Sequence, residues 1–196
     1  SLFIMGNTLY IGGGFSQICG EERHYIAAIN TLNHNLLAWY PESNSEVTII
    51  SGGGNNVFLG GYNWLAGAKK RQYLAAVDLS SGYLTDWNPH PNAPVVTLAV
   101  NGNYIYAGGH FSEIGGQSRS CIAAIDAKGD VTSWNPNADS VVAAIDFHES
   151  QILVGGLFQN IGGQPRNYIA AINSDGNATP WNPNANDPVY TIVVDK

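Results

Sequence analysis

Residues 101–139 read NGNYIYAGGHFSEIGGQSRSCIAAIDAKGDVTSWNPNAD, and four variants of this stretch account for nearly the whole chain. The tryptophans near the end of each copy are spaced by 48, 47 and 47 residues: Trp39, Trp87, Trp134 and Trp181. A Gly-Gly pair, an arginine and an Ile-Ala-Ala-Ile-type core recur in the same register. A period in the high forties, rich in glycine and aromatic residues, is typical of β-propeller arrays.

Each copy contains four strand signals. In the third copy, residues 94–100 form a β-branched run, and Asn101-Gly102 behind it is a strong two-residue hairpin signal. A second strand follows at 104–107 and ends at the glycine pair. After a loop, a third strand is expected at 121–126 and a fourth at 131–134, before Asn-Pro ends the unit. The sequence therefore predicts an all-β propeller of four-stranded antiparallel blades.

The third strand of each unit is apolar on both faces, as in Ile122-Ala-Ala-Ile125. A sheet with one face in water would not carry this pattern, whereas a blade between two other blades requires it. We expect the recurring tryptophans to cover the seams between blades, with each indole N–H bonded to a carbonyl. Each recurring arginine is expected to reach a neighbouring blade's loop or to lie on an aromatic ring. The alternatives are sugar-stacking tryptophans and an anion-binding ring of arginines.

The repeat defines the domain organisation. Residues 1–196 form a single propeller or part of one, with units at about 1–47, 48–96, 97–143 and 144–190. Residues 189–196 then add a surplus innermost strand, in the register that residues 1–4 occupy in the first unit. We therefore expect an excerpt of a larger ring, which further blades or a second copy would close.

Composition limits the partners. The 196 residues carry a formal charge of −7, and four of the eight basic residues are the recurring arginines, which makes nucleic acid a poor expectation. The apolar runs are far shorter than the roughly 20 residues of a spanning helix, so no membrane insertion is expected. No cofactor motif occurs, so no cofactor is predicted. The two cysteines occupy different repeat positions and are expected to be free thiols. Low lysine content and abundant Asn, Gly, Ser and Thr favour an extracellular or cell-surface location. The Asn177-Ala-Thr179 sequon fits that location, but such triplets are also common by chance.

Gly-Gly-x-Phe, a loop with Ile-Gly-Gly, an arginine, Ile-Ala-Ala-Ile-Asp and Trp-Asn-Pro follow one another in the unit. This order resembles the delta-60 type β-propeller repeats of large bacterial exported proteins and, more distantly, the fungal cortical polarity markers. The resemblance covers essentially the whole chain and includes no catalytic signature. It implies a propeller module in a secreted or surface-attached protein. The second unit departs most from the pattern, at residues 62–65 and 67–68.

Asp146 is the candidate catalytic residue. It is a lone carboxylate at a position of the first strand that is apolar in the other units, where we align it with Phe3, Ile50, Ala99 and Val193. With His148 and Glu149 it could also supply metal ligands within four residues. The alternative is that Asp146 accepts a hydroxyl or backbone N–H while residues 148–150 form a hairpin turn.

A candidate binding surface lies in the loop of the second unit. Tyr62, Trp64, Lys69 and Lys70 combine aromatic residues outside the repeat columns with the only adjacent lysine pair. Such a surface would suit an acidic glycan or the edge of a protein. The alternative is a locally repacked loop whose tryptophan fills the space of a missing phenylalanine.

Three functions are compatible with these residues. The first is a non-enzymatic scaffold or interaction module that presents loops to a protein or glycan. The second is a carbohydrate-active or other hydrolytic enzyme, with paired carboxylates in a cleft. The third is a structural spacer in an extracellular fibre or surface layer. The absence of a recognisable catalytic arrangement favours the first.

Overall fold

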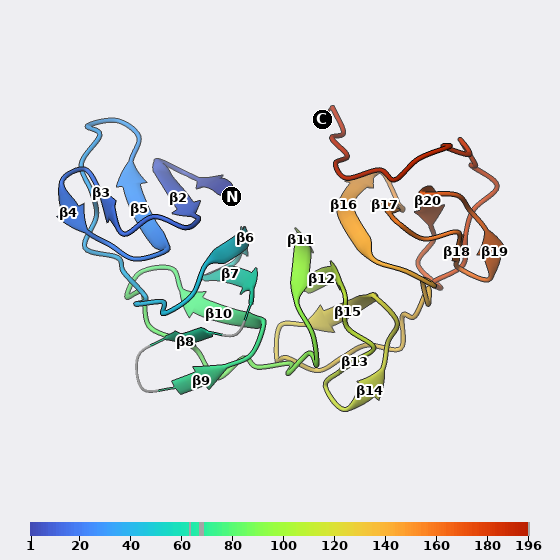
Figure 1. The fold of residues 1–196 in the computed structure, drawn as a ribbon, viewed down its shortest axis with the longest axis horizontal. Helices are drawn as coiled ribbons and strands as arrows, with labels where there is room; N and C mark the ends of the chain where they lie inside the picture. Colours follow the sequence, from blue (N-terminus) through green and yellow to red (C-terminus); the bar gives the residue numbers. More distant parts are fainter. Residues whose placement is uncertain (63, 67–68, 196) are drawn as a thin grey trace.

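A computed structural model describes residues 1–62, 64–66 and 69–195, and the side chains of 1–62 and 70–195. Every regular element in this part of the chain is a β-strand, so none of it is a helix that could cross a membrane. Four small antiparallel sheets follow one another around an arc, and the two chain ends lie at the ends of that arc (Figure 1). The predicted all-β propeller class is confirmed, in the form of an unclosed ring.

Each blade has a three-stranded core in which neighbouring strands in the sheet follow chain order. The innermost strands are β1 (Leu2–Met5), β6 (Val47–Gly53), β11 (Val95–Asn101) and β16 (Val142–His148). The second strands are β2 (Thr8–Gly12), β7 (Asn56–Gly61), β12 (Tyr104–Gly109) and β17 (Gln151–Gly156). The third strands are β5 (Ile26–Asn30), β10 (Leu74–Asp78), β15 (Ile122–Asp126) and β20 (Ile169–Ile172).

The predicted fourth strand is shorter than the sequence suggested. It is present in each blade as one bridge to the third strand: Ile29 to Leu36, Val77 to Leu84, Ile125 to Val131, and Ile172 to Ala178. The chain then bends away. A tryptophan stands three residues after each bridge and a proline two residues after that, and in the first three blades the tryptophan turns into the seam.

The long loop of each unit contains a small hairpin that the sequence did not reveal. These hairpins are β3–β4 (Gln17–Ile18 and Glu21–Glu22), β8–β9 (Trp64–Ala66 and Lys69–Arg71), β13–β14 (Glu113–Ile114 and Gln117–Ser118) and β18–β19 (Asn160–Ile161 and Gln164–Pro165).

The core lies in the seams between blades. The third strands are buried on both faces, as predicted, and the alanines of β5, β10 and β20 have no exposed surface. Gly108 shows why the glycine pairs recur: a Cβ there would stand 2.5 Å from Thr97 Cγ2 and 2.8 Å from Val142 Cγ1 of the next blade. A register irregularity between Val95 and Thr97 faces the pair, so the position combines a bulge with a close approach.

Three of the four recurring tryptophans fill seams between described blades, as predicted, whereas Trp181 is 43% exposed. The indole N–H groups of Trp39, Trp87 and Trp134 donate to the carbonyls of Asp78, Asp126 and Asn173 in the next blade, at 3.1, 3.0 and 3.0 Å. Their rings meet an aromatic ring of their own blade edge-on, at centroid distances of 4.9–5.2 Å. One side chain therefore joins two blades through packing and a hydrogen bond.

The arginines act within their own blades, so the expectation that they reach a neighbouring blade is wrong. Arg71, Arg119 and Arg166 donate from Nη2 to the carbonyls of Thr85, Thr132 and Thr179, at 2.7, 2.6 and 2.7 Å. Each of these threonines comes directly after the bridge residue of the short fourth strand. The arginine therefore bonds the edge of its own sheet. Arg23 instead lies 4.9 Å from the ring centroid of Tyr40, as the aromatic alternative predicted.

A carboxylate or amide at the end of the third strand organises the next turn. The Oδ1 atom of Asp78 accepts the N–H and hydroxyl of Ser81 and of Ser80. The hydrogen bonds from Ser81 and then Ser80 lower the pKa of Asp78 to about 2. The charged form of Asp78 is therefore the one that the turn stabilises.

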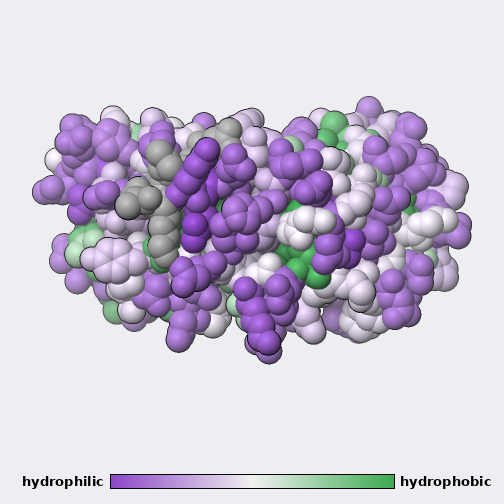
Figure 2. Space-filling view, turned by 90° about the horizontal axis from the view of Figure 1, so that it is seen from below, coloured by the Kyte–Doolittle hydropathy of each residue, from purple (hydrophilic) through white to green (hydrophobic). Residues whose placement is uncertain are grey.

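The molecule seen from below is covered mainly by hydrophilic residues, with a hydrophobic patch near the middle (Figure 2).

Candidate functional site: a cleft between the third and fourth blades

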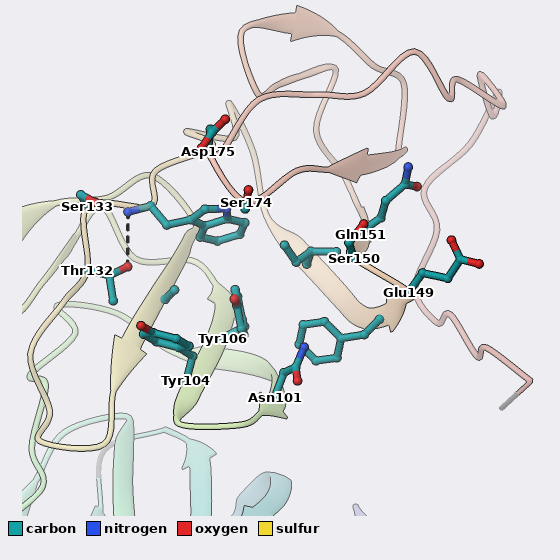
Figure 3. A pocket seen from close by; sticks show the side chains of 14 residues that line it. Asn101, Tyr104, Tyr106, Thr132, Ser133, Glu149, Ser150, Gln151, Ser174 and Asp175 are labelled. Atoms are coloured by element: carbon teal, nitrogen blue, oxygen red, sulfur yellow. Dashed lines mark hydrogen bonds between the residues drawn. The ribbon is translucent and has the colours of Figure 1, made fainter.

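A cleft of about 530 Å³ opens where the hairpins of the third and fourth blades end. The β11–β12 hairpin contributes Asn101, Tyr104 and Tyr106, and the β16–β17 hairpin contributes Phe147 and residues 149–152. Ala124 of β15, residues 132–134 and the turn at Ser174 and Asp175 complete the lining (Figure 3). The volume is in the range of small-molecule sites, and the lining comes from five separate segments.

Aromatic rings form the floor of this cleft. Tyr106 packs edge-on against Trp134 at 5.2 Å and against Phe147 at 5.1 Å between ring centroids. Burial raises the pKa of Tyr106, and the neighbouring Tyr104 adds to that effect. Tyr104 itself is 48% exposed. The cleft therefore has a rigid aromatic base and one accessible tyrosine beside it.

Polar side chains surround the aromatic floor. Thr132 Oγ1 accepts the backbone N–H of Trp134 at 3.3 Å, which fixes the segment that carries Ser133 (Figure 3). Glu149 and Asp175 are the two acidic residues of the lining, and no lysine or arginine is among the lining residues. Hydroxyl, amide and carboxylate groups thus offer hydrogen bonds in a site of negative charge.

This composition is specific to one seam. At the corresponding positions of the seam between the second and third blades, Glu149 is replaced by Gly102, Asp175 by Lys128 and Tyr104 by Asn56. The repeated residues, such as the seam tryptophan, are explained by packing. The residues that differ between seams are free to serve a ligand, and here they gather at one cleft.

Asp146 is held by backbone amides outside the lining of this cleft. Its Oδ1 accepts the N–H of Phe147 at 2.8 Å, and its Oδ2 accepts the N–H of Val194 at 2.9 Å. The strand register also corrects the alignment of Asp146 with the second unit. Asp146 pairs with the third residue of β17, and the residue that pairs with the third residue of β7 is Ser51, not Ile50. The column is therefore not wholly apolar, and the carboxylate binds the chain's C-terminal segment to the fourth blade.

His148 and Glu149 lie at the end of the same hairpin. His148 pairs with Gln151 across a two-residue turn, and Glu149 has a positive φ of 52°. Within residues 1–62, 64–66 and 69–195, no three His, Cys, Asp or Glu side chains are grouped closely enough to hold a metal ion. Of the three proposed ligands, Glu149 belongs to the cleft lining.

The loop of the second unit is described only in part. Tyr62 is exposed, as is Lys70, which pairs with Leu65 in the β8–β9 hairpin. Trp64 and Lys69 belong to these strands, but their side chains lie outside the described residues.

Most of the cleft was missed from the sequence. The sequence predicts Glu149 as a possible metal ligand and places Tyr104 and Tyr106 in an ordinary strand, and it assigns no functional role to Asp175. Departures from the repeat at hairpin tips were the available signal. Reading it required knowing which tips of successive blades meet.

Comparison with known proteins supports the fold. Residues 151–178 match the family model described as "Domain of unknown function (DUF5122) beta-propeller", which supports a β-propeller repeat family. No curated protein matches the chain.

Two solved structures resemble the chain closely in fold. The computationally designed Ika8 protein aligns with a TM-score of 0.63 and 15% identity, over 100% of this chain and 64% of that one. The computationally designed Ika4 protein aligns with a TM-score of 0.56 and 17% identity, over 92% of this chain and 88% of that one. At such identities the likeness concerns the fold alone.

Proposed function

We propose that the chain is a non-enzymatic β-propeller module of a secreted or cell-surface protein, and that it binds a neutral glycan in the cleft between the third and fourth blades. The observation that carries this proposal is the combination of Tyr104, Tyr106 and Trp134 with a surround of hydroxyl, amide and carboxylate groups. Sugars present apolar C–H faces and many hydroxyls, which match aromatic rings and hydrogen-bond acceptors respectively.

The charge of the cleft narrows the ligand class. Glu149 and Asp175 would repel a uronate or a sialylated sugar, and the lining contains no cation to offset them. A neutral oligosaccharide uses both carboxylates as acceptors for its hydroxyls. The acidic glycan suggested by the lysines at 69 and 70 is therefore not the ligand that we propose for this cleft.

The test is a comparison of neutral and acidic oligosaccharides, first on a glycan array and then by titration calorimetry. Neutral ligands should bind, and Tyr104→Ala should weaken their binding about tenfold, the effect of losing one aromatic contact. Tyr83→Ala is the matched control, because Tyr83 is 78% exposed and lies outside the cleft. Equal affinities for the two variants, or binding of acidic ligands alone, would contradict the proposal.

The same two carboxylates favour a second candidate, a glycoside hydrolase, because such enzymes use a pair of acids on either side of the scissile bond. Incubation of the bound oligosaccharide with the protein distinguishes the two functions. A binding module returns the ligand intact. A hydrolase yields products, and Glu149→Gln or Asp175→Asn abolishes their formation.

A further inference from the structure

The three seams inside the chain are built from the same contacts. In each, a tryptophan of one blade donates its indole N–H to the carbonyl at the end of the third strand of the next blade. In each, the first valine of the next inner strand packs against the first glycine of the pair: Val47 on Gly12, Val95 on Gly60 and Val142 on Gly108. A seam therefore has two faces. The donor face carries the tryptophan and the glycine pair, and the acceptor face carries the carbonyl at the end of the third strand and the first valine of the inner strand.

Among the described residues, no further blade covers the donor face of the fourth blade. Trp181 occupies the seam position of the other tryptophans but is 43% exposed, whereas those are 5–7% exposed. Its indole N–H has no acceptor within the part of the chain that the structure describes. Tyr190 is also exposed. The surface is apolar and contains an unused hydrogen-bond donor.

The first blade presents the matching acceptor face. The carbonyls of Asp78 and Asp126 each accept a turn N–H and an indole N–H. The corresponding carbonyl of Asn30 accepts the N–H of His34 and, among the described residues, no indole. The innermost strand of this blade is poorly covered, because Leu2 and Ile4 of β1 are 69% and 62% exposed. The two uncovered faces are therefore the two halves of one seam.

Residues 189–194 already lie where the inner strand of a following blade would lie. A Cβ on Gly155 would stand 2.8 Å from Val189 Cγ1 and 2.9 Å from the Val189 carbonyl, as one on Gly108 would from Val142. The amide of Val194 is bonded to Asp146, and Val193 is 86% exposed. Within the described chain this segment belongs to no sheet, so one of its edges is open to a strand.

We propose that a second copy of the chain covers both faces. The first blade of each copy docks on the fourth blade of the other, so that Trp181 donates to the carbonyl of Asn30. Each copy carries one donor and one acceptor face at the ends of an open arc (Figure 1), and a two-fold axis satisfies both at once in a ring of eight blades.

Only one inner strand fits at each junction. Because residues 189–194 are already bonded to the fourth blade, they replace β1 of the incoming copy. The β1 strand of that copy leaves its pairing with β2, and residues 189–194 pair with β2 instead. By the register of the other blades, Val194 then lies opposite Leu9, as Phe147 lies opposite Ile152.

The mass of the 196-residue chain in solution is the first test, by analytical ultracentrifugation from micromolar concentration upward. The proposal requires a dimer of twice 20.9 kDa, about 42 kDa. Trp181→Glu should weaken dimerisation at least about 30-fold, as expected for a central aromatic residue of an interface. Tyr83→Glu, which alters an exposed aromatic residue outside the seam faces, should leave the dimer unchanged. A monomer, open-ended oligomers, or equal effects of the two variants overturn the proposal.

Trp181→Phe is the second variant, for the case in which Trp181→Glu fails to fold. It keeps an aromatic ring but removes the indole N–H, and it should weaken the dimer about fivefold. An unchanged dissociation constant would contradict the bond to Asn30.

Disulfide trapping tests the strand placement. In a chain whose Cys19 and Cys121 are replaced by serine, Leu9→Cys with Val194→Cys should yield a linked dimer of about 42 kDa on a non-reducing gel. Leu9→Cys alone is the control and should remain unlinked. An intramolecular disulfide, or a dimer without any disulfide, would contradict the exchange of β1 for residues 189–194.

Discussion

Replacing Trp87 with alanine tests the packing of the seams. Trp87 is 5% exposed, its ring meets Phe58 at 5.0 Å, and its indole N–H donates to the Asp126 carbonyl at 3.0 Å. Loss of a buried tryptophan typically costs about 3–5 kcal/mol in the free energy of unfolding. Of this, the aromatic contact accounts for about 1 kcal/mol and the hydrogen bond for about another 1 kcal/mol. The rest is lost burial and the cavity.

Trp87→Phe divides these contributions. It keeps a ring near Phe58 and loses the N–H donor, and the Asp126 carbonyl keeps its bond from the Gly129 amide at 3.1 Å. The Trp87→Phe variant should therefore lose about 1–2 kcal/mol.

Urea denaturation followed by circular dichroism measures both variants against Tyr83→Ala, whose wild-type side chain is 78% exposed. The alanine variant of Trp87 should also melt about 6–20 °C lower than the parent. If it loses less than about 1 kcal/mol, like the Tyr83 control, the tryptophans do not hold the blades together and the seam account is wrong.

Three further predictions concern other parts of the fold. In urea denaturation, Gly108→Ala should destabilise the chain by about 1–3 kcal/mol, because its Cβ would collide with Thr97 and Val142. Gly14→Ala is the control: its Cβ would meet only atoms 4.0 Å away, so it should cost less than about 0.5 kcal/mol. Cys19 is exposed and should react with a thiol reagent at pH 8 within minutes, while Cys121 should lag, because burial and then the charge of Asp139 raise the pKa of its thiol; equal rates for the two would argue against the burial of Cys121. Because the pKa of Asp78 is lowered, its stabilising contribution is present above its ordinary pKa of 3.8 and is lost as the pH falls toward about 2. Between pH 4 and pH 2 the melting temperature of Asp78→Asn should therefore fall less than that of the parent. Parallel curves for the two proteins would contradict this role.

The repeated features of the fold could be read from the sequence because they recur in register. Three of the four strands per blade, the hairpin after Asn101 and the indole-to-carbonyl bonds all follow from residues that appear in every unit. The fourth strand was overestimated, because the tryptophan that ends a unit has β-propensity. In the first three blades it nevertheless turns into the seam after a single bridge, such as the one at Val131. Local propensity cannot decide that competition between pairing and packing.

The candidate site could be predicted much less well. Asp146 attracted attention as an acid in a strand, yet its bond to the Val194 amide depends on a contact across 48 residues. The cleft depends on which hairpin tips meet across a seam, and only the arrangement in space brings Tyr104, Glu149 and Asp175 to one opening. The arginines were assigned to the wrong neighbour for the same reason, since the loop returns over the edge of its own sheet.

The most direct test of the proposed function is an NMR titration of the ¹⁵N-labelled chain with a neutral oligosaccharide selected on the array. Chemical-shift changes should be confined to the segments that line the cleft and should saturate with the affinity found by calorimetry. These segments are residues 101–106, Ala124, and residues 132–134, 147–152 and 174–175. Changes centred instead on residues 62–70, or spread evenly over the blades, would contradict binding in the cleft between the third and fourth blades.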